Sequence, residues 1–254
     1  MHEALLRLPE ERFIYYADHR NTPYGTKPHE VVRDAVLTSV RHIMEESGQE
    51  LRAVVVACNT ATSVAIRDLR ERYDIPIVGM EPAVKPAVEL SRKSGRRVLV
   101  TATQLTLKET KFHELVKRVD DESIVDSLPL PGLVQYCEEL QFEGEEIEAY
   151  FRRAFAGIDF QEYGTIVLGC THFPFYRKTL AGLLPPHIRI VDGNEGTVRR
   201  LSQLLGEAQP SDRRIDVLPN RDADRVRFMC SDADEDYMIK MKTALRAYAE
   251  RSMP

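Results

Sequence analysis

The sequence predicts an α/β protein made of two similar doubly wound parallel-sheet domains, with the candidate active site in the cleft between them. Short β-branched runs alternate with amphipathic stretches along most of the chain, a pattern typical of parallel strands covered by helices. The length of 254 residues fits one large or two smaller domains, at about 150 residues per domain. Two segments, one in each half, also share the same layout around a cysteine.

Eight short apolar segments are expected to form strands. They are residues 13–16, 54–57, 75–79, 98–101, 124–128, 165–168, 188–191 and 226–229. Between them apolar residues recur at helical spacing, as at Val32, Val36 and Val40, with Gly48 as the expected helix stop. From Arg199 onward the chain is expected to be mainly helical, with residues 210–224 as its most loop-like part.

Polar turns near residues 91–97 and 184–186 predict the domain boundaries. Residues 1–93 and 187–254 are predicted to form the first domain, which carries Cys58. Residues 94–186 are predicted to form the second domain, which carries Cys170.

Composition excludes several classes of protein. Apolar residues make up 43% of the chain and charged residues 30%, which excludes disordered and collagen-like chains. The net charge is −5 and no basic stripe is present, so nucleic acid is not an expected partner. No apolar run approaches eighteen residues, so no membrane span is expected and the protein is expected to be cytoplasmic. The four cysteines lack the spacing of a structural zinc site, and no metal is expected.

Two cysteines follow strands in matching contexts. The segments AVVVACNTATSVAI and TIVLGCTHFPFY place Cys58 and Cys170 directly after an apolar strand and before a helical pattern. Both thiols are therefore expected near a helix N-terminus, where backbone N–H groups favour a thiolate. A lone cysteine after a strand is more often a packing residue, and Cys137 and Cys230 are interpreted in that way. The polar residues that follow Cys58 and Cys170 favour chemistry instead.

Two thiols on opposite sides of a cleft suit proton transfer at a stereocentre. One base removes the α-proton from one face of the substrate, and a conjugate acid returns a proton to the other face. Helix N-termini and neutral donors would hold the substrate carboxylate.

The segments YYADHRNTPYGTK, ACNTATSVAI, IPIVGMEPAV and VLGCTHFP together resemble the cofactor-independent glutamate racemases of the aspartate/glutamate racemase superfamily. The resemblance implies interconversion of L- and D-glutamate for peptidoglycan synthesis, with no cofactor and often as a homodimer. It implies that Cys58 and Cys170 are the catalytic pair and that His172 assists the second thiol. The substrate contacts that it implies are Tyr24, Gly25, Asn59, Thr60 and Thr171, and Thr103 and Thr106 match a further substrate loop.

Structural roles remain open for several of these residues. The Pro-Tyr-Gly segment that contains Tyr24 and Gly25 is also a good turn, and His172 could be a satisfied core histidine. Asn59 and Thr60 are natural N-cap residues. Asp18, after the first expected strand, is interpreted as a turn cap.

Two departures from the family pattern bear on activity. The sequence lacks the N-terminal strand and the D-S-G-x-G-G loop, which leaves open whether Met1 is the natural start. Gln135 stands where we place the family's glutamate, and Glu138 or Glu139 would replace it only if the helix shifted. Turnover is therefore expected to be weakened, because a general acid–base group contributes roughly 10²–10⁴-fold. A silent relative that binds an amino acid or a protein, and a racemase for aspartate, remain alternatives.

Overall fold

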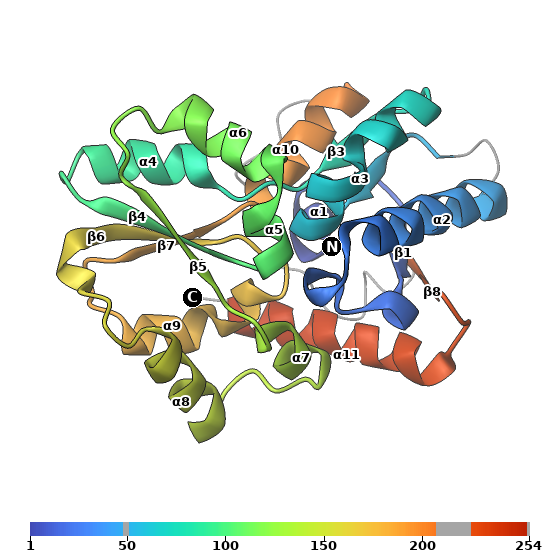
Figure 1. Ribbon diagram of the computed structural model, residues 1–254. Helices are drawn as coiled ribbons and strands as arrows, with labels where there is room; N and C mark the ends of the chain where they lie inside the picture. The colour runs from blue at the N-terminus through green and yellow to red at the C-terminus, as the bar shows by residue number, and fades with distance from the viewer. Residues whose placement is uncertain (48–50, 207–224, 253–254) are drawn as a thin grey trace.

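The computed structural model of the protein describes residues 1–47, 51–206 and 225–252 (Figure 1). Its strands are β1 Phe13–Ala17, β2 Val54–Val56, β3 Ile77–Gly79, β4 Arg97–Ala102, β5 Val125–Pro129, β6 Tyr163–Leu168, β7 Arg189–Asp192 and β8 Val226–Cys230. All eight expected strands are present, each within two residues of its predicted ends. The expected stop at Gly48 and the expected loop 210–224 lie outside the described residues.

Helices occupy most of the chain between the strands. They are α1 His2–Arg7, α2 His29–Ser47, α3 Asn59–Arg72, α4 Val84–Arg92, α5 Gln104–Lys108, α6 Thr110–Val119, α7 Leu133–Glu138, α8 Glu145–Ala154, α9 Arg177–Leu183, α10 Asn194–Leu205 and α11 Glu235–Ser252. Short 3₁₀ turns are η1 His19–Asn21, η2 Tyr24–Thr26, η4 Phe160–Glu162 and η5 Phe173–Tyr176. No helix within the described ranges is both long and apolar enough to cross a bilayer.

The larger sheet is doubly wound, as predicted. Its four strands are parallel in the order β5-β4-β6-β7, with α4 and α6 on one face and α8 and α9 on the other (Figure 1). Alternation along β4 explains this arrangement. Val98 and Val100 pack with α4 and α6, while Leu99 packs with α7, α8 and α9, because successive side chains of a strand point to opposite faces.

The strands of the other half form two separate parallel pairs, β1 with β8 and β2 with β3. Helices α2 and α3 pack together against β2 and β3 around Val36, Ala65 and Ile77. Helices α1 and α10 pack beside them around Leu8, Val78 and Leu201. Parallel α/β organisation is thus confirmed. The expected single sheet in this half is not, because no strand of the described residues joins β1 to β2.

Sheet pairing differs from the predicted domain boundaries. Strand β7 was assigned to the first domain but pairs with β6 through residues 189–192. Helix α4 was assigned there too, yet Val84 and Val88 pack against the strands of the larger sheet. The polar turn near residues 91–97 therefore connects a helix to the next strand of the same sheet and does not separate domains.

Helix α11 links the two halves. It follows β8, and its far end packs on the core of the larger sheet through Ala247, where Arg251 pairs with Glu143 at 3.1 Å. Figure 1 shows this helix, in red, running along the base of the molecule from β8 to the region of α9. Tyr237, near the start of this helix, reaches Glu138 at the end of α7.

Candidate active site

Cys58 caps the N-terminus of α3. Its backbone is extended and its Sγ accepts a hydrogen bond from the Ala61 N–H at 3.4 Å, which is the duty of an N-cap side chain. Burial raises the pKa of the Cys58 thiol to about 11, the Ala61 N–H acts against that shift, and Cys170 adds to it. The backbone donors at the helix N-terminus lower the pKa of Cys58 as expected, but desolvation outweighs them, so the net shift is upward.

Cys170 lies two residues after β6 and begins the turn into η5. Its side chain is buried, and its Sγ is 3.7 Å from Nδ1 of His172. The other ring nitrogen of His172, Nε2, is 2.8 Å from Oε1 of Glu138 at the end of α7. The larger sheet and its helices thus assemble a line of three groups: thiol, imidazole and carboxylate.

His172 and Glu138 lie within ion-pair distance, and each shifts the pKa of the other toward the charged form. Burial lowers the pKa of His172, but hydrogen bonds with Cys170 and Glu138 raise it more, so the pKa lies well above its usual value of 6.5. Burial raises the pKa of Glu138, but the hydrogen bond with His172 and the groups on α11 lower it more, so the net shift is downward. The charged form of His172 would therefore lie beside the Cys170 Sγ, 3.7 Å away.

Gln135 is not the residue that faces His172. Its exposed side chain donates from Nε2 to Oε1 of Glu139 at 3.0 Å. Glu138 lies one helical turn further along α7, and that rise of about 4.5 Å carries its carboxylate to His172. One signal for this was present in the sequence. Leu133 and Cys137 are four residues apart and mark the buried face of α7, and Glu138 is next to Cys137. The weakening expected from Gln135 has no basis in this geometry.

Three buried threonines close a ring of hydroxyls beside Cys58. Thr60 Oγ1 lies 2.9 Å from Thr103 Oγ1 and 3.0 Å from Thr106 Oγ1, and the last two are 2.9 Å apart. Gly25 packs against this ring, since a Cβ there would lie 2.6 Å from Thr103 Cβ. The ring joins the head of α3 to the turn that begins α5.

Other predicted residues have simpler surroundings. The Tyr24 hydroxyl donates to Asp18 Oδ2 at 2.6 Å, and Asn21 donates to the same carboxylate. Asp18 therefore accepts hydrogen bonds from the side chains of Tyr24 and Asn21. Its side chain makes no cap bond to η1, so the interpretation as a turn cap is wrong. Asn59 is buried, and its Oδ1 has no hydrogen-bond partner among the described residues. Thr171 is half-buried between Cys170 and His172.

The structure brings several predicted residues into mutual influence. Cys170 raises the pKa of Cys58, and Cys58 raises the pKa of Tyr24. Thr60 hydrogen-bonds Cys58. The pair therefore shares an electrostatic environment although 112 residues separate the two thiols in sequence. Within the residues that the structure places, no group of three or more His, Cys, Asp or Glu side chains is arranged so that it could hold a metal ion.

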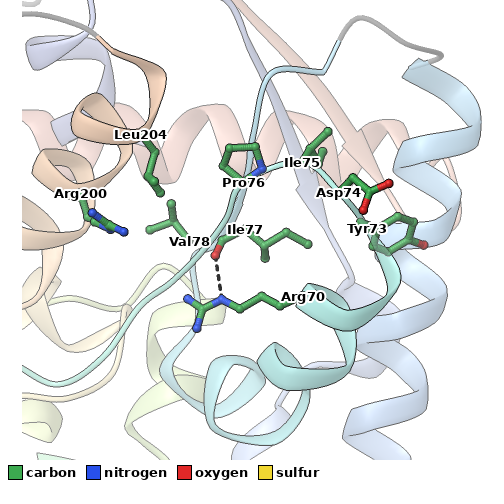
Figure 2. Close-up of a pocket in the computed structure, with 9 residues that line it drawn as sticks. All are labelled: Arg70, Tyr73, Asp74, Ile75, Pro76, Ile77, Val78, Arg200 and Leu204. Carbon is green, nitrogen blue, oxygen red and sulfur yellow. Dashed lines mark hydrogen bonds between the residues drawn. The ribbon is translucent and has the colours of Figure 1, made fainter.

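A hollow lies away from this site. The cavity in Figure 2 has a volume of about 540 Å³ and lies between the end of α3, strand β3 and α10. Arg70 and Arg200 line it, and Arg70 donates to the Ile77 carbonyl at 3.1 Å. Neither Cys58 nor Cys170 belongs to its wall.

Fold and site together define a parallel-sheet α/β protein with two thiols at strand ends, one of them supported by a histidine–glutamate pair. The sequence pattern of Asp/Glu/hydantoin racemases matches residues 1–201. The chain therefore belongs to the Asp/Glu/hydantoin racemase family, which confirms the resemblance seen in its four motifs.

Individual relatives agree with this assignment. The chain is 54% identical to the glutamate racemase of Halothermothrix orenii over 203 residues, which cover 80% of this chain and 78% of that protein. It is 44% identical to glutamate racemase 2 of Bacillus subtilis over 207 residues, 82% and 77% of the two chains.

A solved structure shows the same fold. The crystal structure of Escherichia coli glutamate racemase, in complex with L-glutamate and the activator UDP-MurNAc-Ala, matches with a TM-score of 0.77 and 29% identity. The match covers 96% of this chain and 89% of that one.

Proposed function

We propose that this protein interconverts L- and D-glutamate without a cofactor and supplies D-glutamate for peptidoglycan synthesis. Membership of the racemase family and the curated glutamate racemases at 41–54% identity support the substrate. The observation that carries the mechanism is the Cys170–His172–Glu138 line in electrostatic contact with Cys58.

In this mechanism the two thiols exchange protons with opposite faces of the α-carbon. In one direction Cys170 acts as the base and, as a thiolate, takes the α-proton, so an S–H bond forms as the C–H bond breaks, with His172 Nδ1 3.7 Å from its Sγ. The Cys58 thiol, which its raised pKa keeps protonated at neutral pH, donates its proton to the other face. The reverse reaction starts from the opposite protonation states.

The substrate carboxylate and ammonium need partners beside the thiols. Asn59 supplies a buried, unpartnered Oδ1 that suits an ammonium donor. Thr60 and Thr171 lie next to the two cysteines. Tyr24 and Gly25, from η2, are proposed to contact the substrate beside Cys58. These five residues form the proposed binding shell.

Single substitutions of the cysteines test the proposal. Cys58→Ala and Cys170→Ala are each expected to abolish racemisation, followed by circular dichroism of L- and D-glutamate, while α-proton exchange with D₂O reports each half-reaction. Cys230→Ala is the control, because Cys230 also ends a parallel strand but its thiol bonds the Asp234 carbonyl at 3.5 Å. Parent-rate racemisation by both active-site variants would contradict the two-thiol mechanism.

A silent relative that binds glutamate is the second candidate. Burial raises the pKa of Cys58 to about 11, which disfavours the Cys58 thiolate that the reverse reaction needs. Calorimetry with glutamate separates the candidates, because binding without turnover supports the silent form. Running the same assay with aspartate tests the other substrate.

Three further properties belong to the proposal. The four cysteines are free thiols, which fits a reducing cytoplasm. The separate strand pairs leave sheet edges that favour association, so light scattering is expected to show a homodimer. The division into two domains, with the boundaries moved so that α4 and β7 join the larger sheet, is testable by limited proteolysis.

A further inference from the structure

Helix α11 sends two side chains to the carboxylate of Glu138. The Tyr237 hydroxyl donates to Glu138 Oε2 at 2.8 Å, and the Lys240 Nζ is 3.7 Å from the same oxygen. The other oxygen, Oε1, pairs with His172. Both oxygens of this partly buried carboxylate are therefore occupied, and they are occupied from opposite halves of the fold.

Tyr237 is itself held in place. Its ring stacks on His19, with centroids 4.2 Å apart and planes inclined by 22°, and Lys240 Nζ lies 5.1 Å from its centroid. His19 is fixed in turn by Ser231 Oγ at 3.2 Å. A tyrosine held on its ring in this way presents its hydroxyl in one direction, because few rotamers remain open to it.

We propose that Tyr237, assisted by Lys240, is a positioning residue that fixes the Glu138 carboxylate and thereby aligns His172 with Cys170. The inference rests on the proposed racemase function and deepens it. It assigns a role in the active site to the C-terminal helix, which starts beside β8 and is outside the matched family region of residues 1–201.

The physical reason is control of both the orientation and the charge of one carboxylate. The groups that face Glu138 are His172 from the start of η5, Tyr237 and Lys240 from α11, and Tyr15 from β1. The first three lower the pKa of Glu138 against the effect of burial. Without the Tyr237 hydroxyl, the carboxylate keeps His172 and Lys240 but is less firmly oriented and takes up a proton at higher pH, so His172 loses its partner sooner.

Tyr237→Phe tests this directly, since it keeps the stacked ring and removes only the hydroxyl. We expect kcat to fall roughly tenfold, as small misplacements of catalytic groups do, and KM to change by less than about twofold. The acidic limb of kcat/KM is expected to move up by roughly one pH unit, the worth of one hydrogen bond to a charged group. Lys240→Gln should move the limb in the same direction by less.

Tyr248→Phe is the matched control. It makes the same substitution on the same helix, where the hydroxyl accepts from Asn194 at 3.2 Å and does not reach Glu138. Its pH profile should equal that of the parent. A direction-specific readout is the primary deuterium isotope effect, which should rise in Tyr237→Phe only for the enantiomer whose α-proton Cys170 removes.

The outcomes separate this inference from the proposed function. An active parent whose Tyr237→Phe and Lys240→Gln variants keep the parent kcat and acidic limb overturns the inference alone. Circular dichroism at each pH of the profile establishes that the variants remain folded, so reduced stability does not mask the limb position. A parent inactive on glutamate overturns the proposed function, and ¹³C NMR titration of the Glu138 carboxyl, assigned with Glu138→Gln, then decides: unchanged titration in Tyr237→Phe refutes the inference.

Discussion

Replacing Glu138 with Gln removes one negative charge from the centre of the site and keeps the side-chain shape. In the parent, Glu138 Oε1 lies 2.8 Å from His172 Nε2, and the two side chains are 24% and 28% exposed. Water therefore screens this pair only in part. The amide still accepts a hydrogen bond but no longer stabilises the imidazolium electrostatically.

The expected cost follows from the role of the pair. A positioned acid–base group contributes roughly 10²–10⁴-fold to a rate, and Glu138 acts through His172, so the lower end applies. We expect kcat to fall about 10²-fold, which corresponds to roughly 2.7 kcal/mol of barrier. The basic limb of the pH profile should move to lower pH, because Glu138 helps to raise the pKa of His172.

The assay is racemisation measured in both directions between pH 5 and pH 10. Glu139→Gln is the matched control, because this neighbouring glutamate is exposed and its Oε1 accepts a hydrogen bond from Gln135. A kcat for Glu138→Gln within about threefold of the parent, or an equal loss in Glu139→Gln, would refute the reasoning.

The same substitution gives a stability signature. The raised pKa of His172 contributes stability below pH 6.5 that is lost as pH rises through its folded value. The lowered pKa of Glu138 contributes stability above pH 4.5 that is lost as pH falls through its folded value. Urea unfolding should therefore show the largest difference between parent and Glu138→Gln from pH 4.5 to 6.5, and a smaller one at pH 10.

Three further predictions concern the side of the site that holds the first thiol. Gly25→Ala should destabilise the protein by about 1–3 kcal/mol in urea unfolding, because the new Cβ meets Thr103 at 2.6 Å, while Gly182→Ala, which meets nothing within 4 Å, should not. Thr60→Val should cost about 1–3 kcal/mol because it removes the bonds of Thr60 to Thr103 and Thr106, and an unchanged unfolding midpoint would contradict the closed ring. Alkylation of Cys58 by iodoacetamide, followed by peptide mass spectrometry, should keep accelerating above pH 9, because its pKa is about 11, and a plateau near pH 8.5 would contradict that value.

The local sequence pattern was sufficient to predict the strands of this fold. Each expected strand is present because β-branched apolar runs and helical periodicity are properties of a few consecutive residues. The positions of Cys58 and Cys170 at strand ends follow from the same pattern. Membership of the racemase family was likewise readable from four short motifs, and the comparison with known sequences confirmed it.

Pairing between distant segments was not readable in this way. No local pattern indicates that β7 lies beside β6 and not in the first half, or that the first half splits into two strand pairs. Both depend on which apolar faces meet when the chain closes, and a strand with two apolar faces satisfies more than one neighbour.

The sequence by itself determined the α/β class, where the strands lie along the chain, and the placement of the two thiols at strand ends. These features depend on residues close together along the chain. Only the tertiary structure decided that Glu138 and not Gln135 meets His172, and that Tyr237, 99 residues from Glu138, completes the line. Each of these contacts requires that the polar atoms of a side chain be placed to within about an ångström. That direction is set by packing around it, and no periodicity encodes it.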